Sequence, residues 1–274
     1  MSAGRVSRSR PLPGDPVAAL LDRLRALGSE RNRAGMARFG IRVDRALGVS
    51  VTELRRVARG VGRDHGLALE LWATGVHEAR LLACFVDEPA AVTPAQMEAW
   101  ANELDSWDLC DQAATSLFDR TPHAWGMARR WARREGEWVR RAGFALMAGL
   151  ASHDRAAGDE AFVGLLPLIE RGAFDERHYV KKAVSWALRG LGKRNAALHV
   201  AAIAAAERLL AAANAKAGGD RGGAPPARAA RWVARDALTE LRGRRPPALT
   251  PAGSPACAAG APRACARRAR GRGR

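Results

Sequence analysis

The chain of 274 residues carries 45 lysines and arginines against 28 acids, a formal net charge of +17 at pH 7. Apolar residues make up 47% of the sequence, which excludes wholesale disorder and suffices for one or two ordinary cores. No apolar run reaches the roughly 20 residues that span a bilayer, and the N-terminal stretch has no signal-peptide core. We therefore expect a soluble protein without a membrane partner, located in the cytoplasm and associated with the nucleoid.

Much of the positive charge sits at the two ends of the chain. Twelve arginines, within residues 1–10 and 242–274, face no acid there, which leaves only +5 for residues 11–240. Basic tails bind polyanions without selecting among them. The composition predicts a disordered basic N-terminus over 1–14, a single folded domain over 15–243, and a disordered tail rich in Ala, Pro and Arg over 244–274.

Helical periodicity begins at "VTELRRVARGVG", residues 51–62, where Val51, Leu54, Val57 and Val61 share one stripe and the arginines lie off it. Similar stripes run through 76–86, 138–150, 180–191 and 196–210. Strand signals are nearly absent, because β-branched and aromatic residues are sparse and no alternating run is bounded by hairpin turns. The sequence predicts an all-α fold of about a dozen short helices.

Four of these segments share a shape, with a start residue, a polar pair, and then small and apolar residues. They are "HEARLLACF", "DLCDQAATS", "WVRRAGFAL" and "YVKKAVSWAL", which start at residues 77, 108, 138 and 179, spaced by 31, 30 and 41. This spacing predicts a HEAT-like helical-repeat solenoid with an insertion before the fourth unit; a compact orthogonal bundle is the alternative. When the four segments are aligned at their first residues, the fourth position is occupied by Arg80, Asp111, Arg141 and Lys182. These side chains should line one basic concave face.

The last part of the predicted domain is interrupted by "AKAGGDRGGAPPA", residues 215–227, which we interpret as a flexible linker before one more basic amphipathic helix. Four cysteines without close-pair spacing and six scattered histidines give no ligand pattern, so we predict no metal. No phosphate-cradling glycine loop or nucleophile elbow is present either, and no cofactor is expected.

The acidic stretch "ELDSWDLCDQ", residues 103–112, stands out in a basic chain. Asp105 and Asp108 suit helix capping, whereas Asp111 lies a full turn further in and shares a helix side with Trp107. Trp186 falls off the apolar stripe of its helix and onto a cationic face. It either makes a packing or cation–π contact or is an exposed aromatic beside phosphate-binding cations.

The runs "GVSVTELRRVAR", "LALELWATGVHEARLLACFV", "SWDLCD", "WVRRAGFALMA" and "YVKKAVSWALR", in this order, resemble the AlkD-like DNA alkylation-repair glycosylases, a family of HEAT-like repeats. The resemblance covers roughly residues 20–243. It implies removal of N3- or N7-alkylated purines from duplex DNA by a monofunctional glycosylase, and we expect a monomer. By matching motifs, the family's site residues fall on Trp107, Asp111, Arg141 and Trp186. The linker and the arginine tail lie outside the family pattern.

The residues make this chemistry plausible, since a cationic purine leaves without a proton donor and one carboxylate then suffices, unlike the pair that most glycosidases need. Asp111 is expected to stabilise the oxocarbenium-like sugar, the two tryptophans to face the deoxyribose, and Arg141 to grip a phosphate. Cations predicted to contact DNA are Arg80, Arg140, Lys182, Arg189 and Lys193. Two alternatives stay open: a helical-repeat module that binds DNA structure without catalysis, and a protein-binding solenoid.

Overall fold

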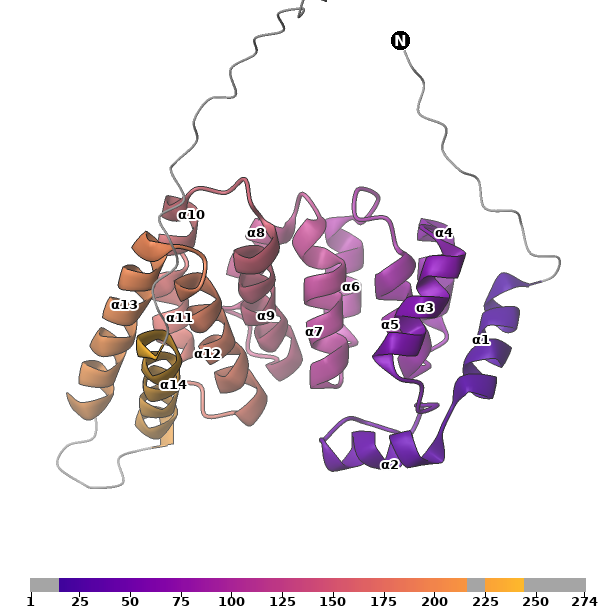
Figure 1. Cartoon of the computed structure of the whole chain (residues 1–274), viewed down its shortest axis with the longest axis horizontal. Helices are drawn as coiled ribbons and strands as arrows, with labels where there is room; N and C mark the ends of the chain where they lie inside the picture. The colour runs from indigo at the N-terminus through magenta and orange to yellow at the C-terminus, as the bar shows by residue number, and fades with distance from the viewer. Residues whose placement is uncertain (1–14, 216–224, 244–274) are drawn as a thin grey trace, which may run out of the picture.

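The computed structural model describes residues 15–215 and 225–243 (Figure 1). The two predicted terminal tails, and residues 216–224 of the predicted linker, lie outside the described residues. Within them the chain forms fourteen α-helices and one 3-10 helix, and no strand. The prediction of an all-α fold is confirmed.

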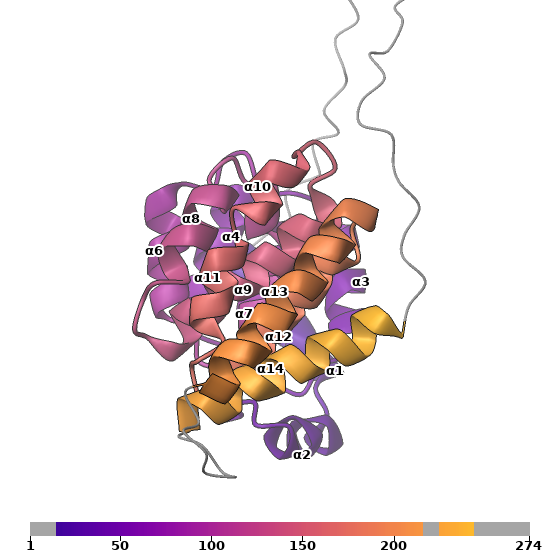
Figure 2. The ribbon, with the colours of Figure 1, turned by 90° about the vertical axis from the view of Figure 1, so that its left-hand side faces the viewer.

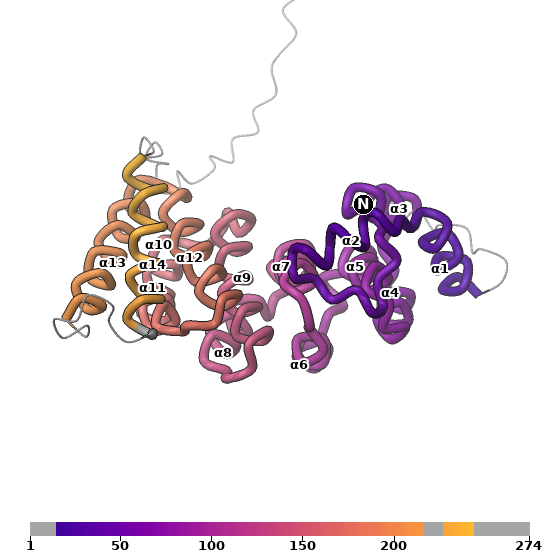
Figure 3. The backbone as a smooth tube through the Cα atoms, turned by 90° about the horizontal axis from the view of Figure 1, so that it is seen from below, coloured from indigo at the N-terminus to yellow at the C-terminus, as the bar shows by residue number. Residues whose placement is uncertain are grey.

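The helices form two layers that curve together, seen end-on in Figure 3. Successive helices of the inner layer pack on one another: α3 (Val51–Val61), α5 (His77–Val86), α7 (Trp107–Ser116), α9 (Glu137–His153), α12 (His178–Gly192) and α14 (Pro225–Arg242). The outer layer consists of α4 (His65–Ala73), α6 (Pro94–Asn102), α8 (Ala124–Trp131), α11 (Leu166–Gly172) and α13 (Ala196–Ala215). An inner helix followed by an outer one is the repeating unit of a HEAT-like solenoid, so the bundle alternative is excluded.

The insertion predicted before the fourth repeat is also present. It contains the short α10 (Asp159–Val163), which precedes the outer helix α11. Earlier in the chain, a 3-10 helix, η1 (Phe118–Arg120), follows α7. Helix α14 begins at Pro225, inside the range predicted for the linker, and packs across α12 and α13 (Figure 2).

Polar contacts about one repeat apart tie the inner helices together. The buried carboxylate of Glu78 on α5 accepts the backbone N–H groups of Leu47, Gly48 and Val49 at 2.7–3.3 Å. One repeat later His77 Nε2 lies 2.8 Å from Asp108 Oδ2. Because buried charged groups are costly unless paired, each such contact fixes one helix against the next.

The core lies between the layers and contains a run of aromatic rings. Trp72 of α4 stacks on Trp100 of α6 with ring centroids 4.0 Å apart, and Phe118 joins Trp100 to Trp131 of α8. Helix α9 is the central element, since almost every residue from Val139 to Ala151 is buried. Such packing makes the inner wall a rigid platform for side chains that project from it.

Helix α13 is long and apolar enough to cross a membrane by length and composition, contrary to the expectation that no segment would be. In this fold one face of the helix is a core face, with buried Leu198, Ala202, Ala206 and Leu209, and it packs against α12 and α14. A buried core helix passes the same test as a spanning one.

The N-terminal part consists of α1 (Pro16–Leu27), capped by Asp15, and α2 (Glu30–Arg38), capped by Ser29. In Figure 1 α2 lies across the lower end of the upright helices. The loop after it contains Gly40 and Gly48, both with positive φ, a backbone conformation that glycine adopts without strain. This loop carries the chain back to α3 beneath the inner wall.

Candidate nucleic-acid interface and catalytic site

A groove of about 730 Å³ runs along the C-terminal halves of the inner helices. Four arginines line it, Arg55 and Arg59 from α3, Arg63 just beyond α3, and Arg120 from η1, and all four are exposed. Among the residues that the structure describes, no carboxylate lines this groove. Its positive charge is therefore available to an anionic ligand.

The partners of these arginines are neutral. Arg55 donates to the side-chain amide oxygen of Gln112 at 3.2 Å, and Arg120 donates to the Ser116 carbonyl at 2.7 Å. Arg63 contacts the carbonyls of Phe85 and Asp87, and Arg59 has no ion-pair partner in residues 15–215 and 225–243. Of the four, Arg120 has a carboxylate close by, the buried Asp119 beside it, but most of the positive charge of the groove is available to a phosphate backbone.

Asp111 lies on α7, one turn before Thr115, which lines the groove. Arg141 of α9 grips its carboxylate: Nη2 lies 2.8 Å from both oxygens, and Nε donates to Oδ1 at 3.1 Å. The remaining Nη1 donates to the Tyr179 carbonyl at 2.6 Å. The side chain of Arg141 is only 6% exposed, against 19% for Asp111, so the carboxylate is the more accessible partner.

Burial raises the pKa of Asp111 to about 6, although the charge and hydrogen bonds of Arg141 act in the opposite direction. The carboxylate is therefore ionised at neutral pH and protonated in mild acid. Carboxylates with raised pKa values are common at functional sites. Because few water molecules screen such a carboxylate, its charge acts strongly on a ligand that reaches its exposed side.

Trp107 precedes Asp111 by one turn of α7, as predicted, and its indole reaches the end of α2. Its Nε1 donates to the Phe39 carbonyl at 2.9 Å, and the Tyr179 hydroxyl donates to the Gly40 carbonyl at 3.5 Å. Tyr179 in turn packs against Trp138, with ring centroids 5.0 Å apart. The end of α2 thus holds two aromatic side chains beside the Asp111–Arg141 pair.

Trp186 lies two turns beyond Tyr179 on α12 and lines the arginine groove. It is half-buried and packs against the core, so the structure shows both the packing contact and the exposed face that were alternatives. Of the four predicted catalytic residues, Asp111 and Arg141 are in contact and Trp107 lies one turn before Asp111 on α7, whereas Trp186 lines the groove from α12.

The role expected for Arg141 needs correction. Its donors are occupied by Asp111 and Tyr179 and its side chain is buried, so it is not placed to grip a phosphate. A buried guanidinium in a bidentate pair orients the carboxylate and neutralises part of its charge.

Four of the five cations predicted to contact DNA already have acidic partners within the protein. Arg80 pairs with Glu103 at 2.5 Å and lies over the Trp72 ring, and Arg140 lies 3.3 Å from the Asp175 carboxylate. Arg189 contacts Asp236 and Glu240, and Lys193 also contacts Glu240. Lys182 alone of the five is exposed with no ion-pair partner among the described residues.

Arg80 is turned toward the outer layer. Its guanidinium donates to Glu103, just after α6, and lies over the Trp72 ring of α4, so it does not project from the inner wall as predicted.

Asp108 is not a simple cap. Burial acts to raise the pKa of Asp108, but the hydrogen bond and charge of His77, together with hydrogen bonds from Ser106 and the Leu109 backbone, bring it below its usual value. Burial acts to lower the pKa of His77, and the hydrogen bond and charge of Asp108, with the nearby carboxylates, raise it. Asp105 contacts Ser106 and lies 3.8 Å from Arg42. Both aspartates thus have local partners, which separates them from Asp111.

Sequence reasoning missed the groove arginines. Their signal was the spacing of Arg55, Arg59 and Arg63 at intervals of four, which puts them on one side of a helix. The neighbouring Arg56 forms an i, i+3 ion pair with Glu53 and does not line the groove.

The two-layer curved fold and the arginine-lined groove define a helical-repeat protein of the nucleic-acid-binding kind. Residues 20–241 match the model of the DNA alkylation repair enzyme family, and the chain belongs to that family. No curated protein matches the chain.

One solved structure is similar to this protein, with a TM-score of 0.64 and 22% sequence identity. The match covers 70% of this chain and 82% of the chain in that structure. It is described as a new family of proteins related to the HEAT-like repeat DNA glycosylases with affinity for branched DNA structures. At this identity the likeness supports the fold.

Proposed function

We propose that the protein hydrolyses the N-glycosidic bond of N3- or N7-alkylated purines in duplex DNA. Family membership and the arginine groove support DNA as the substrate class. The observation that carries the catalytic part is Asp111, a partly exposed carboxylate held by Arg141, one turn after Trp107 and one turn before Thr115, which lines that groove.

In the proposed reaction Arg55, Arg59, Arg63 and Arg120 bind the phosphate backbone, and Lys182 extends this surface along α12. The alkylated base carries a positive charge and leaves as a neutral purine, so no general acid is required. Asp111 stabilises the positive charge that develops on the deoxyribose and orients the attacking water. Trp107 and Trp186 offer aromatic faces to the cationic nucleotide.

Arg141 acts as a positioning residue in this scheme. Its bidentate contact fixes the orientation of the Asp111 carboxylate and, against the effect of burial, favours the ionised form. A carboxylate already in place when charge develops needs no reorganisation during the reaction.

The direct test is base release from duplex DNA that contains N7-methylguanine, measured under single-turnover conditions. We expect Asp111→Asn to slow release at least about tenfold, roughly 1.4 kcal/mol of barrier, with DNA affinity near wild type. Asp105→Asn is the matched control, because it makes the same change six residues earlier, at a residue bound to Ser106 and near Arg42, and should leave release unchanged. Equal release by Asp111→Asn and wild type would end the catalytic assignment.

A second candidate is binding of branched DNA without catalysis, favoured by the description of the similar solved structure. It requires the groove arginines and not the Asp111 carboxylate. Preference for a four-way junction over a duplex, together with no base release by the wild type, would support it.

A further inference from the structure

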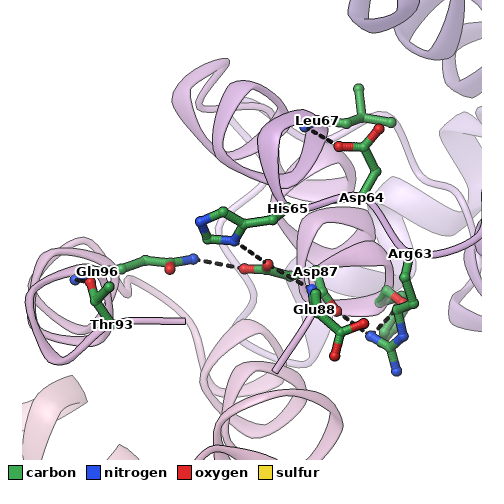
Figure 4. A network of polar contacts seen from close by, with 9 residues as sticks. Arg63, Asp64, His65, Leu67, Asp87, Glu88, Thr93 and Gln96 are labelled. Carbon is green, nitrogen blue, oxygen red and sulfur yellow. Dashed lines mark hydrogen bonds and ion pairs between the residues drawn. The ribbon is translucent and has the colours of Figure 1, made fainter. Parts of the chain in front are cut away.

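Among the described residues, two histidines each contact an aspartate whose side chain is fully buried. The first pair is His65 with Asp87, whose Nδ1 and Oδ1 lie 2.7 Å apart (Figure 4). Asp87 Oδ1 also accepts the Glu88 backbone N–H at 2.8 Å, and Oδ2 accepts the side-chain amide of Gln96 at 2.7 Å. Both oxygens are satisfied, and the pair joins α4, α5 and α6 as a structural tie.

The second pair is His153, in the last turn of α9, with Asp119 of η1. His153 Nδ1 contacts Asp119 Oδ2, whereas Asp119 Oδ1 is buried and has no hydrogen-bond partner in the described part of the chain. A Cβ at residue 149 would lie 2.8 Å from Asp119 Oδ2, so the glycine there makes room for the carboxylate. A half-satisfied buried carboxylate is costly, which argues for a use other than packing.

The two histidines differ in what surrounds them. His153 is 42% exposed and lines the arginine groove, and His65 does not. Since Nδ1 of His153 is engaged by Asp119, Nε2 is the nitrogen left for a ligand. In the protonated ring Nε2 carries a hydrogen and can donate to a phosphate oxygen. In the neutral ring with its hydrogen on Nδ1, which faces Asp119, Nε2 has only a lone pair and cannot donate.

We propose that His153, held by Asp119, is a proton-linked phosphate-binding group that makes DNA binding by the groove depend on pH. The inference rests on the proposed placement of DNA in the groove. When phosphate arrives beside Nε2 the charged ring is favoured, so binding takes up a proton at His153. The bound ring then donates from Nδ1 to Asp119 and from Nε2 to the phosphate.

Other charged groups around His153 set the direction of this linkage. Arg120 of η1, Arg59 and Arg63 on the side of α3, and Arg194 after α12, which donates to the Ala151 carbonyl, all disfavour a second positive charge. Asp119 favours it, and Asp154, the next residue along the chain, is engaged by Trp125. DNA phosphates neutralise the arginines and so shift the balance toward the charged ring.

The test is the affinity of the full chain for a short, undamaged, fluorescently labelled duplex, measured at constant ionic strength. Between about pH 6 and about pH 8 the wild type should lose roughly fivefold to tenfold in affinity. His153→Gln should bind at both values as the wild type does at the higher pH, and His153→Arg as it does at the lower. His65→Gln is the matched control and should keep the wild-type pH dependence.

Two further measurements separate linkage from folding defects. Asp119→Asn keeps His153 but removes the carboxylate, and should shift the affinity change to lower pH. Calorimetry of binding in two buffers with different ionisation enthalpies should show proton uptake by the wild type and little by His153→Arg. Unchanged pH dependence in His153→Gln would refute the proposal.

Failure of this inference and failure of the proposed function are distinguishable. Base release depends on Asp111, which His153 does not contact, and the linkage assay uses undamaged DNA. A pH-dependent affinity without base release would support the role of His153 and refute the glycosylase activity. Base release with a pH-independent affinity would support the glycosylase activity and refute the role of His153.

Discussion

Replacement of Arg141 by methionine separates the two roles that this residue could have. Methionine is close in length, has no charge, and leaves Asp111 buried without its counter-ion. At about 4 Å and an effective dielectric constant of about 20, a pair of unit charges interacts by about 4 kcal/mol. Much of that is offset by the relaxation of groups around the site, and a carboxyl that loses an arginine partner usually rises by about 1 to 3 in pKa.

The pKa of Asp111, about 6 in the wild type, should therefore rise to between about 7 and about 9 in Arg141→Met. The ionised form is the active one, so release should fall as pH drops through the pKa. At pH 7 about nine-tenths of wild-type Asp111 is ionised; with a pKa of about 8 the fraction is slightly under about one-tenth, a roughly tenfold loss.

The assay is single-turnover base release across the pH range with saturating protein, so that DNA affinity does not enter. The apparent pKa should move upward in Arg141→Met, and release at high pH should recover toward the wild-type plateau. If Arg141 gripped a phosphate instead, affinity would fall and the apparent pKa would stay near about 6. That second pattern would refute the positioning role.

Other expected results follow from the same contacts. Arg59→Ala, which removes a groove cation without an ion-pair partner in the described ranges, should weaken DNA binding and make the salt slope shallower by roughly 0.9. Arg189→Ala should leave that slope nearly unchanged, because Asp236 and Glu240 already neutralise the charge; equal slopes in the two variants would contradict this sorting. Glu78→Ala leaves three backbone N–H groups without an acceptor and should lower the free energy of unfolding, measured with urea, by about 2–4 kcal/mol. The control is Glu70→Ala at an exposed site, for which we expect a loss within about 0.5 kcal/mol. An equally small loss in Glu78→Ala would show that the Glu78 contact is unimportant.

The fold was predictable because it depends on short-range patterns. Stripes such as Val51, Leu54 and Val57 specify helices, and their recurrence about every 30 residues specifies a solenoid, since each unit can bury its apolar face only against the next. The pairing of Trp107 with Asp111 was predictable for the same reason, because one turn of α7 fixes both.

The sorting of cations was not predictable from the sequence. Arg59 and Arg189 are both helical arginines off the apolar stripe, yet Glu240, 51 residues beyond Arg189, decides that only Arg59 stays uncompensated in the described structure. The same holds for His65 and His153, which differ only in whether their aspartate is otherwise satisfied and whether the ring lines the groove.

By itself, then, the sequence determined the helices, their period and the Trp107–Asp111 pair, because these follow from residue spacing along one chain segment. Only the tertiary structure decided that Arg141 holds Asp111, and that the groove belongs to arginines from α3 and η1. The reason is physical: the charge that a side chain presents depends on its partners, and those partners come from helices 30 and 51 residues away in the sequence.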